Sequence, residues 1–183
     1  YKEFKTELND LLRQEIRGLI LDLRGNPGGS LDECTQIADY LLGEQVIVYT
    51  EDRAGEKTYY RSDKNKVDLP LVVLVDGGSA SASEILTGAI QDSESGVVVG
   101  TQTFGKGLVQ SVIELRDHTA FKLTTSQYFT PDGTNIHSVG ITPDIVVEPS
   151  EDETQDLQLD KAMEVIQSSI QESVNASVQG ASN

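Results

Sequence analysis

The sequence predicts an α/β layered domain in which strand–helix units are combined with antiparallel strand pairs. Two apolar runs are each followed by a turn rich in small residues and then by a helical pattern, which indicates strand, loop and helix. Two further stretches show the alternation that is typical of half-buried hairpins. Elements of both kinds bury their apolar faces in layers, so this combination predicts a mixed α/β fold without fixing its topology.

The order of elements follows from periodicity and turn residues. A helix opens the chain because apolar residues recur with helical spacing from Phe4 to Ile16. A strand at 18–23, a glycine loop and a helix at 30–42 come next, and Ser30 with Glu33 forms a capping-box pattern. The remaining predicted elements are a hairpin of 45–50 and 57–61, a strand at 69–76, a helix at 82–91, a strand at 97–100, an antiparallel pair of 107–115 and 120–127, a short strand at 146–147 and a helix at 157–166.

Length and charge limit the organisation and the partners. At 183 residues the chain is long enough for one domain, with a core over 1–150. An acidic segment at 151–183 predicts a C-terminal helix and a frayed tail, either part of that domain or an appendage. The 14 basic and 30 acidic residues give a formal charge of −16, which repels phosphate backbones, so we expect no nucleic-acid partner.

Cofactor and metal chemistry find little support. The single cysteine, Cys34, excludes an intrachain disulfide and lies in a predicted helix as a small buried residue. Neither His118 nor His137 has neighbours at metal-ligand spacing, and the glycines of 25–29 do not match a dinucleotide fingerprint. We therefore expect neither a metal nor a cofactor. A Ser-His-Asp triad stays open, because its geometry is spatial, but neither histidine has a motif around it.

Two turns carry the chemistry that the sequence suggests. Ser81 lies among small residues between a predicted strand and a predicted helix, where backbone N–H groups are free to hold a developing oxyanion. Lys106 lies between two glycines and could take the proton of a serine hydroxyl, although burial would have to lower its pKa by roughly 3 units. Phe104 could supply apolar surroundings, and Gln110 could orient the amine. Alone, a serine here is typically an N-cap and a lysine is typically solvated.

Five segments together resemble the carboxyl-terminal processing peptidases, also called the tail-specific protease family. They are Ser-Ala-Ser-Ala-Ser-Glu-Ile at 79–85, Thr-Phe-Gly-Lys-Gly-Leu-Val-Gln at 103–110, Leu-Asp-Leu-Arg-Gly-Asn-Pro-Gly-Gly at 21–29, Tyr-Phe-Thr-Pro-Asp-Gly at 128–133 and Gly-Ile-Thr-Pro-Asp-Ile at 140–145. The resemblance spans about residues 15–148. It implies a crotonase-like or ClpP-like arrangement of repeated strand-strand-helix units.

The resemblance also implies the roles of individual residues. Ser81 would be the nucleophile, Lys106 the general base and Gln110 the residue that positions the lysine. The oxyanion donors would be the backbone N–H of Ala82 and that of Gly28, with Gly29 a close second. Ser79 and Ser83 would then be turn residues.

The expected function is that of a serine endopeptidase that cleaves proteins near or from their C-terminal end through an acyl-enzyme. Two alternatives remain: a non-catalytic peptide-binding module on the same fold, and a crotonase-like enzyme that acts on acyl-thioesters. A normal pKa for Lys106 would favour the first alternative, and binding of coenzyme A the second.

The family implies a wider context. Its members commonly carry a PDZ domain that captures substrate, and nothing in these 183 residues resembles one, so we expect it elsewhere in a full-length protein. An isolated fragment could then be weakly active or inactive. We expect an extracytoplasmic location, secreted or anchored through a segment absent from this chain. The partners are protein or peptide substrates, and a homo-oligomer is possible.

Overall fold

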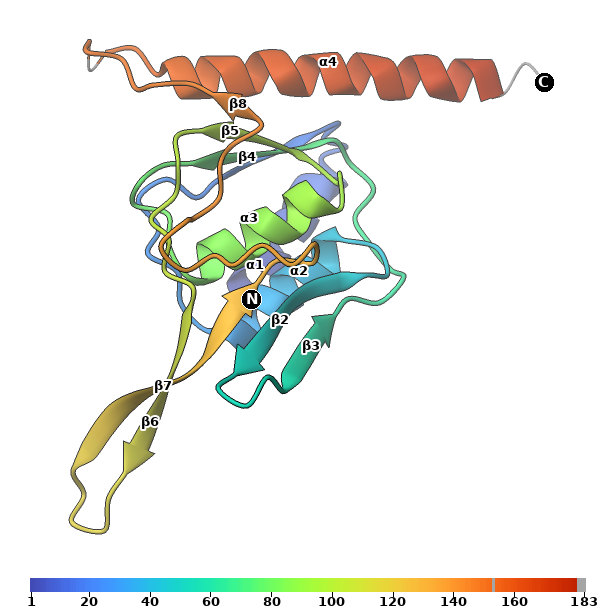
Figure 1. The fold of residues 1–183 in the computed structure, drawn as a ribbon. Coiled ribbons are helices and arrows are strands. Elements are labelled where there is room, and N and C mark those ends of the chain that lie inside the picture. Colours follow the sequence, from blue (N-terminus) through green and yellow to red (C-terminus); the bar gives the residue numbers. More distant parts are fainter. Residues whose placement is uncertain (153, 181–183) are drawn as a thin grey trace.

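Two four-stranded sheets and four helices make up the described part of the chain (Figure 1). The computed structural model describes residues 1–152 and 154–180, with side chains up to residue 175. The parallel sheet has the order β1-β4-β5-β8 and consists of β1 (Leu19–Asp22), β4 (Leu71–Val75), β5 (Val97–Gly100) and β8 (Ile145–Val146). The antiparallel sheet has the order β3-β2-β7-β6 and consists of β2 (Val46–Asp52), β3 (Lys57–Arg61), β6 (Leu108–Glu114) and β7 (Ala120–Phe129). The helices are α1 (Lys2–Arg13), α2 (Leu31–Leu41), α3 (Ala82–Asp92) and α4 (Leu157–Gly180).

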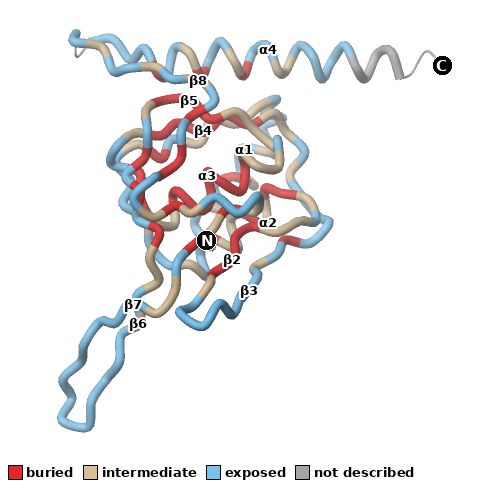
Figure 2. The backbone as a smooth tube through the Cα atoms, viewed as in Figure 1, coloured by how far each residue is buried: buried red, intermediate tan, exposed pale blue. Residues whose placement is uncertain are grey.

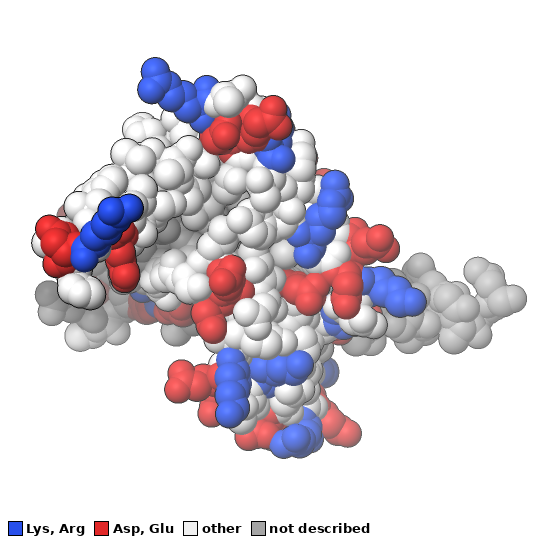
Figure 3. All heavy atoms as spheres, turned by 90° about the horizontal axis from the view of Figure 1, so that it is seen from below, with Lys and Arg blue, Asp and Glu red and all other residues white. Residues whose placement is uncertain are grey.

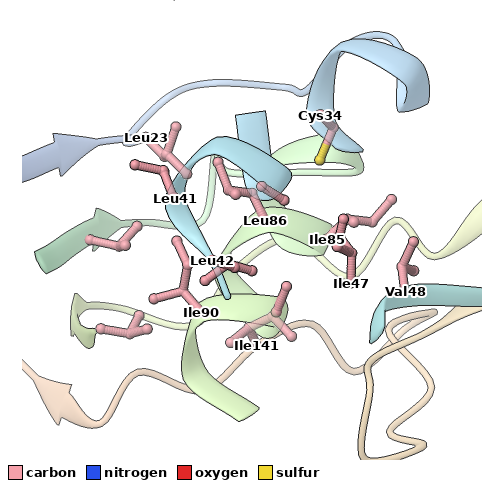
Figure 4. Close-up of a cluster of buried hydrophobic side chains, with 14 of the residues drawn as sticks. Leu23, Cys34, Leu41, Leu42, Ile47, Val48, Ile85, Leu86, Ile90 and Ile141 are labelled. Carbon is pink, nitrogen blue, oxygen red and sulfur yellow. The ribbon is translucent and has the colours of Figure 1, made fainter. Parts of the chain in front are cut away.

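The main core lies between the two sheets, where α2 and α3 pack together. Helix α3 contacts β2 of one sheet and β5 of the other, and its residues 83–90 are all buried. Figure 4 shows Ile85, Leu86 and Ile90 of this helix among side chains from α2 and β2. A helix that is surrounded in this way must be largely apolar, and that burial fixes the position of its first turn.

The parallel sheet is covered on both faces. All five residues of β4 are buried: Val73 and Val75 belong to the main core, whereas Val72 and Leu74 pack on the opposite face. Ala162 and Ile166 of α4 cover that second face. The continuous apolar run of β4 is therefore explained by a parallel strand with helices on either side.

The hairpin of β6 and β7 extends away from the body of the molecule (Figures 1 and 2). Most of its residues are exposed, among them Val112, Phe121 and Leu123. The pairing has a register shift between Val109 and Gln110, close to the end of β6 that joins the body. The base of this hairpin therefore lies near the core while its tip is surrounded by solvent.

The sequence prediction of a mixed α/β class with these strand–helix units and hairpins is confirmed. Helix α4 is longer than predicted, because it continues past Ile166 to Gly180 and so runs through most of the segment expected to fray. Glu153 and residues 181–183 of the acidic segment lie outside the described residues. Acidic and basic side chains are interspersed on the face shown in Figure 3. No helix within the described ranges is both long and apolar enough to cross a membrane.

Candidate active site

Ser81 occupies the turn between β4 and α3 in an unusual backbone conformation. The strand ends at Val75 and the helix begins at Ala82, so the serine is the last residue before the helix. Its φ of 56° and ψ of −115° lie outside the regions that L-residues normally adopt. Such strain persists only where the surroundings enforce it, and a strained serine at a sharp strand-to-helix turn is typical of exposed nucleophiles.

The hydroxyls of the two flanking serines bond to backbone. Ser79 is buried, and its Oγ donates a hydrogen bond of 2.7 Å to the carbonyl of Leu23. Ser83 Oγ donates one of 3.1 Å to the carbonyl of Asn26. Of the three serines, only Ser81 has a positive φ. Ser79 lies in the turn, as expected, whereas Ser83 is the second residue of α3 and is not a turn residue.

The glycine loop at 25–29 lies directly against the segment at 76–81 that carries Ser81, which we call the serine turn. Asp76 Oδ1 accepts hydrogen bonds of 2.8 Å from the backbone N–H groups of both Gly25 and Gly78, so one carboxylate joins the two segments. A second link is the 3.0 Å bond from Ala80 N–H to the carbonyl of Asn26. The two segments that the sequence assigned to the oxyanion site are therefore adjacent.

Gly28 has the closest approach to the serine turn. A Cβ at this position would lie 2.4 Å from Ala80 O and 2.7 Å from Ala82 N, and the φ of +87° also requires glycine. However, the N–H of Gly28 donates to Asn26 Oδ1 at 2.9 Å. The hydrogen bonds of the described residues include none from the N–H of Gly29. The choice between the two glycines as oxyanion donor stays a prediction, and this bond favours Gly29.

Glu84 connects the serine turn to the segment at 101–107 that carries Lys106, which we call the lysine loop. This fully buried residue, three positions after Ser81, accepts a bond of 2.8 Å from Ser81 N–H and another of 2.8 Å from Lys106 N–H, both at Oε2. Its Oε1 accepts from Thr103 Oγ1 at 2.6 Å and from Gly105 N–H at 2.7 Å. Since both backbone nitrogens bond to one oxygen, those of Ser81 and Lys106 lie no more than twice 2.8 Å apart.

The expected burial of Lys106 is wrong. The residue is exposed, and Phe104, which was expected to supply apolar surroundings, is 67% exposed. The reason is that the loop is fixed through its backbone. The N–H groups of Gly105 and Lys106 donate to Glu84, and Phe104 N–H donates to Ser79 O at 3.0 Å. The described residues therefore place the lysine backbone beside the serine without burying the lysine.

Gln110 lies on β6 and is exposed. It pairs with Thr124 of β7 immediately after the register shift that follows Val109. Among the hydrogen bonds of the described residues, none joins Gln110 to Lys106. Its predicted role in positioning the lysine stays a prediction.

A cavity of ≈170 Å³ opens beside the proposed oxyanion groups. Its lining includes Gly28, Gly29 and Ala82, together with the polar residues Asn26, Ser30, Glu33 and Ser83. The apolar residues Leu23, Cys34, Ile37 and Leu86 are also part of its wall. Burial raises the pKa of the Cys34 thiol to about 12, and its Sγ donates to the carbonyl of Ala82 at 3.1 Å. This thiol is therefore a protonated part of the cavity wall.

Arg24 anchors the start of the glycine loop. Its guanidinium bonds to both carboxylate oxygens of Asp156, just before α4, at 2.8 and 2.9 Å. It also bonds to Asp22 at 2.7 Å. These bonds hold the pKa of both carboxyls below their usual range. The loop is thus tied to α4 as well as to the serine turn.

Metal ligation has no support in the part of the chain that the structure describes, where no group of three or more His, Cys, Asp or Glu side chains could hold a metal ion. His118 lies in the turn of the β6–β7 hairpin with a φ of 65°. The backbone of His137 lies beside Gly107, where a Cβ on the glycine would be 2.3 Å from the backbone nitrogen of His137.

Residues 1–147 match peptidase family S41, and the chain belongs to this family. It is 49% identical over 138 residues to the carboxy-terminal-processing protease of Bartonella bacilliformis, covering 73% of this chain and 32% of that protein. It is 48% identical over 149 residues to the carboxyl-terminal-processing protease of Synechocystis sp., covering 81% of this chain and 35% of that protein.

Among solved structures, the photosystem II D1 C-terminal processing protease superposes with a TM-score of 0.74 at 37% identity. This match covers 87% of this chain and 41% of that one. The sequence-based resemblance to carboxyl-terminal processing peptidases is therefore confirmed. The chain spans about a third of the length of the curated relatives that it matches.

Proposed function

We propose that this chain is the catalytic portion of a serine endopeptidase that cleaves proteins near or from their C-terminal end. The observation that carries the proposal is the shared bond acceptor, Glu84 Oε2, which brings the backbone of Ser81 and of Lys106 together. The strained conformation of Ser81 supports its role as nucleophile. The names of the relatives support the choice of C-terminal processing. On this proposal the core has the crotonase-like or ClpP-like arrangement of strand-strand-helix units.

In the proposed mechanism, Lys106 Nζ removes the proton of Ser81 Oγ as that oxygen attacks the scissile carbonyl carbon. The carbonyl oxygen becomes an oxyanion, which the backbone N–H groups of Ala82 and of Gly29 or Gly28 stabilise. Collapse expels the leaving amine, which takes its proton from the lysine, and an ester to Ser81 remains. Lys106 then deprotonates a water molecule that attacks the ester carbonyl, and the lysine returns this proton to the released Ser81 Oγ. Gln110 orients the lysine amine.

A neutral lysine is required for this chemistry, although Lys106 is exposed. We propose that bound substrate covers the lysine, because the exposed Phe104 beside it offers an apolar contact for a peptide. Removing water from around an ammonium group lowers its pKa, since the charged form loses its solvation.

The ≈170 Å³ cavity is the proposed site for the side chain of the residue whose carbonyl is attacked. It adjoins Ala82 and the glycine loop, and so lies beside the proposed oxyanion site. Leu23, Ile37 and Leu86 in its wall would contact an apolar part of that side chain, while Asn26, Ser30, Glu33 and Ser83 also line the cavity.

The wider context stays a proposal. We propose that the full-length protein carries a PDZ domain outside this chain and acts at an extracytoplasmic location, secreted or anchored through another segment. A homologous enzyme from Tetradesmus obliquus is named as chloroplastic. A longer protein that includes the additional domain should cleave faster than this chain, and equal rates would contradict that part of the proposal.

The proposal is tested by cleavage of an unfolded protein with an apolar C-terminal tail, read by mass spectrometry. The chain is compared with Ser81→Ala and with Ser83→Ala, a matched control at the start of α3 whose hydroxyl bonds to Asn26 O. We expect fragments from the chain and from Ser83→Ala but none from Ser81→Ala. Fragments that persist in Ser81→Ala would overturn the assignment of the nucleophile.

A further inference from the structure

Glu84 is a buried acid without a cationic partner. It is 0% exposed, and none of the ion pairs found among the described residues includes it. Its negative charge is instead balanced by three backbone N–H groups and one hydroxyl. A carboxylate accepts all four of these bonds, two at each oxygen.

Helix capping explains only one of these bonds. A glutamate three residues after an N-cap normally bonds back to the N-cap N–H, and the bond to Ser81 is of this kind. The other three bonds come from Thr103, Gly105 and Lys106, which lie about twenty residues further along the chain. An acid that served only as a cap would not need them.

The two carboxylate oxygens of Glu84 bond to different parts of the site. Oε2 joins Ser81 to Lys106, and Oε1 holds Thr103 and Gly105 of the same loop. If the lysine loop moved relative to the serine turn, the buried carboxylate of Glu84 would lose hydrogen-bond donors, and the loss would cost free energy. Thr103 is fixed in turn, since its Oγ1 accepts a bond of 2.7 Å from Ile141 N–H.

We propose that Glu84 is the positioning residue that sets the distance between Ser81 and Lys106, an inference that rests on the proposed function of these two residues. It touches neither substrate nor the reacting atoms and acts through the backbone of both residues. Glutamine has the same shape, but its amide NH₂ would face the N–H groups of Ser81 and Lys106 in one orientation and the N–H of Gly105 in the other, where the Thr103 hydroxyl can rotate to accept. Glu84→Gln therefore opposes at least one of the four bonds while leaving the volume of the core unchanged.

The test measures how fast a fluorophosphonate modifies Ser81 between pH 6 and 10, in the chain and in Glu84→Gln. We expect the variant to react about 100-fold more slowly at neutral pH, as for a misplacement near 1 Å. Its rate should rise steadily with pH, because hydroxide replaces the displaced lysine. A loss of stability alone would leave the pH profile of the folded protein unchanged. A folded Glu84→Gln with the rate and the profile of the parent would overturn the proposal.

Thr103 supplies a milder pair of variants in case Glu84→Gln does not fold. Thr103→Val removes one donor to Glu84 and the acceptor of the Ile141 N–H, whereas Thr103→Ser keeps the hydroxyl that makes both bonds. We expect Thr103→Val to react about 10-fold more slowly than Thr103→Ser and with an altered pH profile. Equal rates and profiles would count against the proposal.

Hydrogen–deuterium exchange gives a readout that needs no activity. The N–H groups of Ser81, Gly105 and Lys106 should exchange faster in Glu84→Gln, or in Thr103→Val for the last two, than in the parent. Unchanged exchange would overturn the positioning role. The two proposals can fail separately. If the fluorophosphonate labels the parent without requiring Ser81, while the N–H groups still exchange faster in the variant, the proposed function is refuted but the bridge made by Glu84 remains.

Discussion

Replacing Gly28 by alanine should abolish the proposed peptidase activity, whereas the same change at Gly29 should be tolerated. An added Cβ at position 28 would lie 2.4 Å from Ala80 O and 2.7 Å from Ala82 N, and the backbone there has a φ of +87°. At position 29 a Cβ meets nothing within 4 Å, and the backbone is not in the left-handed region. The two substitutions have the same chemistry and differ only in what the methyl group meets.

The size of the effect follows from these distances. An ordinary contact begins near 3.4 Å, so the glycine loop or the serine turn must move by about 1 Å, and an L-residue in the left-handed region costs a further ~1–2 kcal/mol. A displacement of this size in a catalytic site costs about 100-fold in rate, and loss of one oxyanion donor costs about 100- to 1,000-fold. We therefore expect kcat/KM for peptide cleavage to fall about 100-fold or more in Gly28→Ala and to change less than about 3-fold in Gly29→Ala.

The assay is cleavage of a chromogenic peptide, with circular dichroism and thermal unfolding to confirm that both variants are folded. A folded Gly28→Ala with the parent's kcat/KM would refute the placement of the glycine loop against the nucleophile. Equal losses in both variants would refute the steric argument.

Three further predictions concern stability and reactivity. Asp156→Asn should lower the free energy of unfolding by less than about 1 kcal/mol, measured with urea. The lowered pKa of Asp156 beside Arg24 means that this contribution is present above about pH 4 and is lost as the pH falls through the folded-state pKa, so the difference should vanish in acid. Cys34 should react with iodoacetamide at pH 8 about 10³-fold more slowly in the folded chain than in denaturant, because its pKa is raised to about 12; similar rates by mass spectrometry would contradict its burial. Ile166→Ala should cost about 2–4 kcal/mol in urea unfolding, whereas Met163→Ala on the exposed side of α4 should cost less than about 0.5, and equal costs would show that α4 does not cover the sheet.

The strand–turn–helix units were predictable because their signals are local. The apolar run at 69–76, the small residues after it and the helical pattern at 82–91 together predict a sharp turn at Ser81, and the structure has one. The hairpins were equally predictable from alternation and turn residues. The way in which the two sheets sandwich α3 depends on contacts between distant segments, which periodicity does not encode.

The role of Glu84 was missed although a signal for it exists in the sequence. Ser81 and Glu84 have the spacing of a capping box, which predicts one bond at a helix start. The pattern does not reveal that the first turn of this helix is buried, nor that a loop twenty residues away supplies three more donors. The burial of Lys106 was mispredicted for a related reason, because a phenylalanine beside glycines says nothing about which way the loop faces.

The central claim is that Ser81 is a nucleophile activated by Lys106, and mapping of covalent modification tests it most directly. The chain is treated with a fluorophosphonate, digested and sequenced by tandem mass spectrometry, beside Lys106→Ala. We expect one adduct, on Ser81 and not on Ser79 or Ser83, and at least about 100-fold slower modification in Lys106→Ala. An adduct on another residue, or equal modification of Lys106→Ala, would contradict the account.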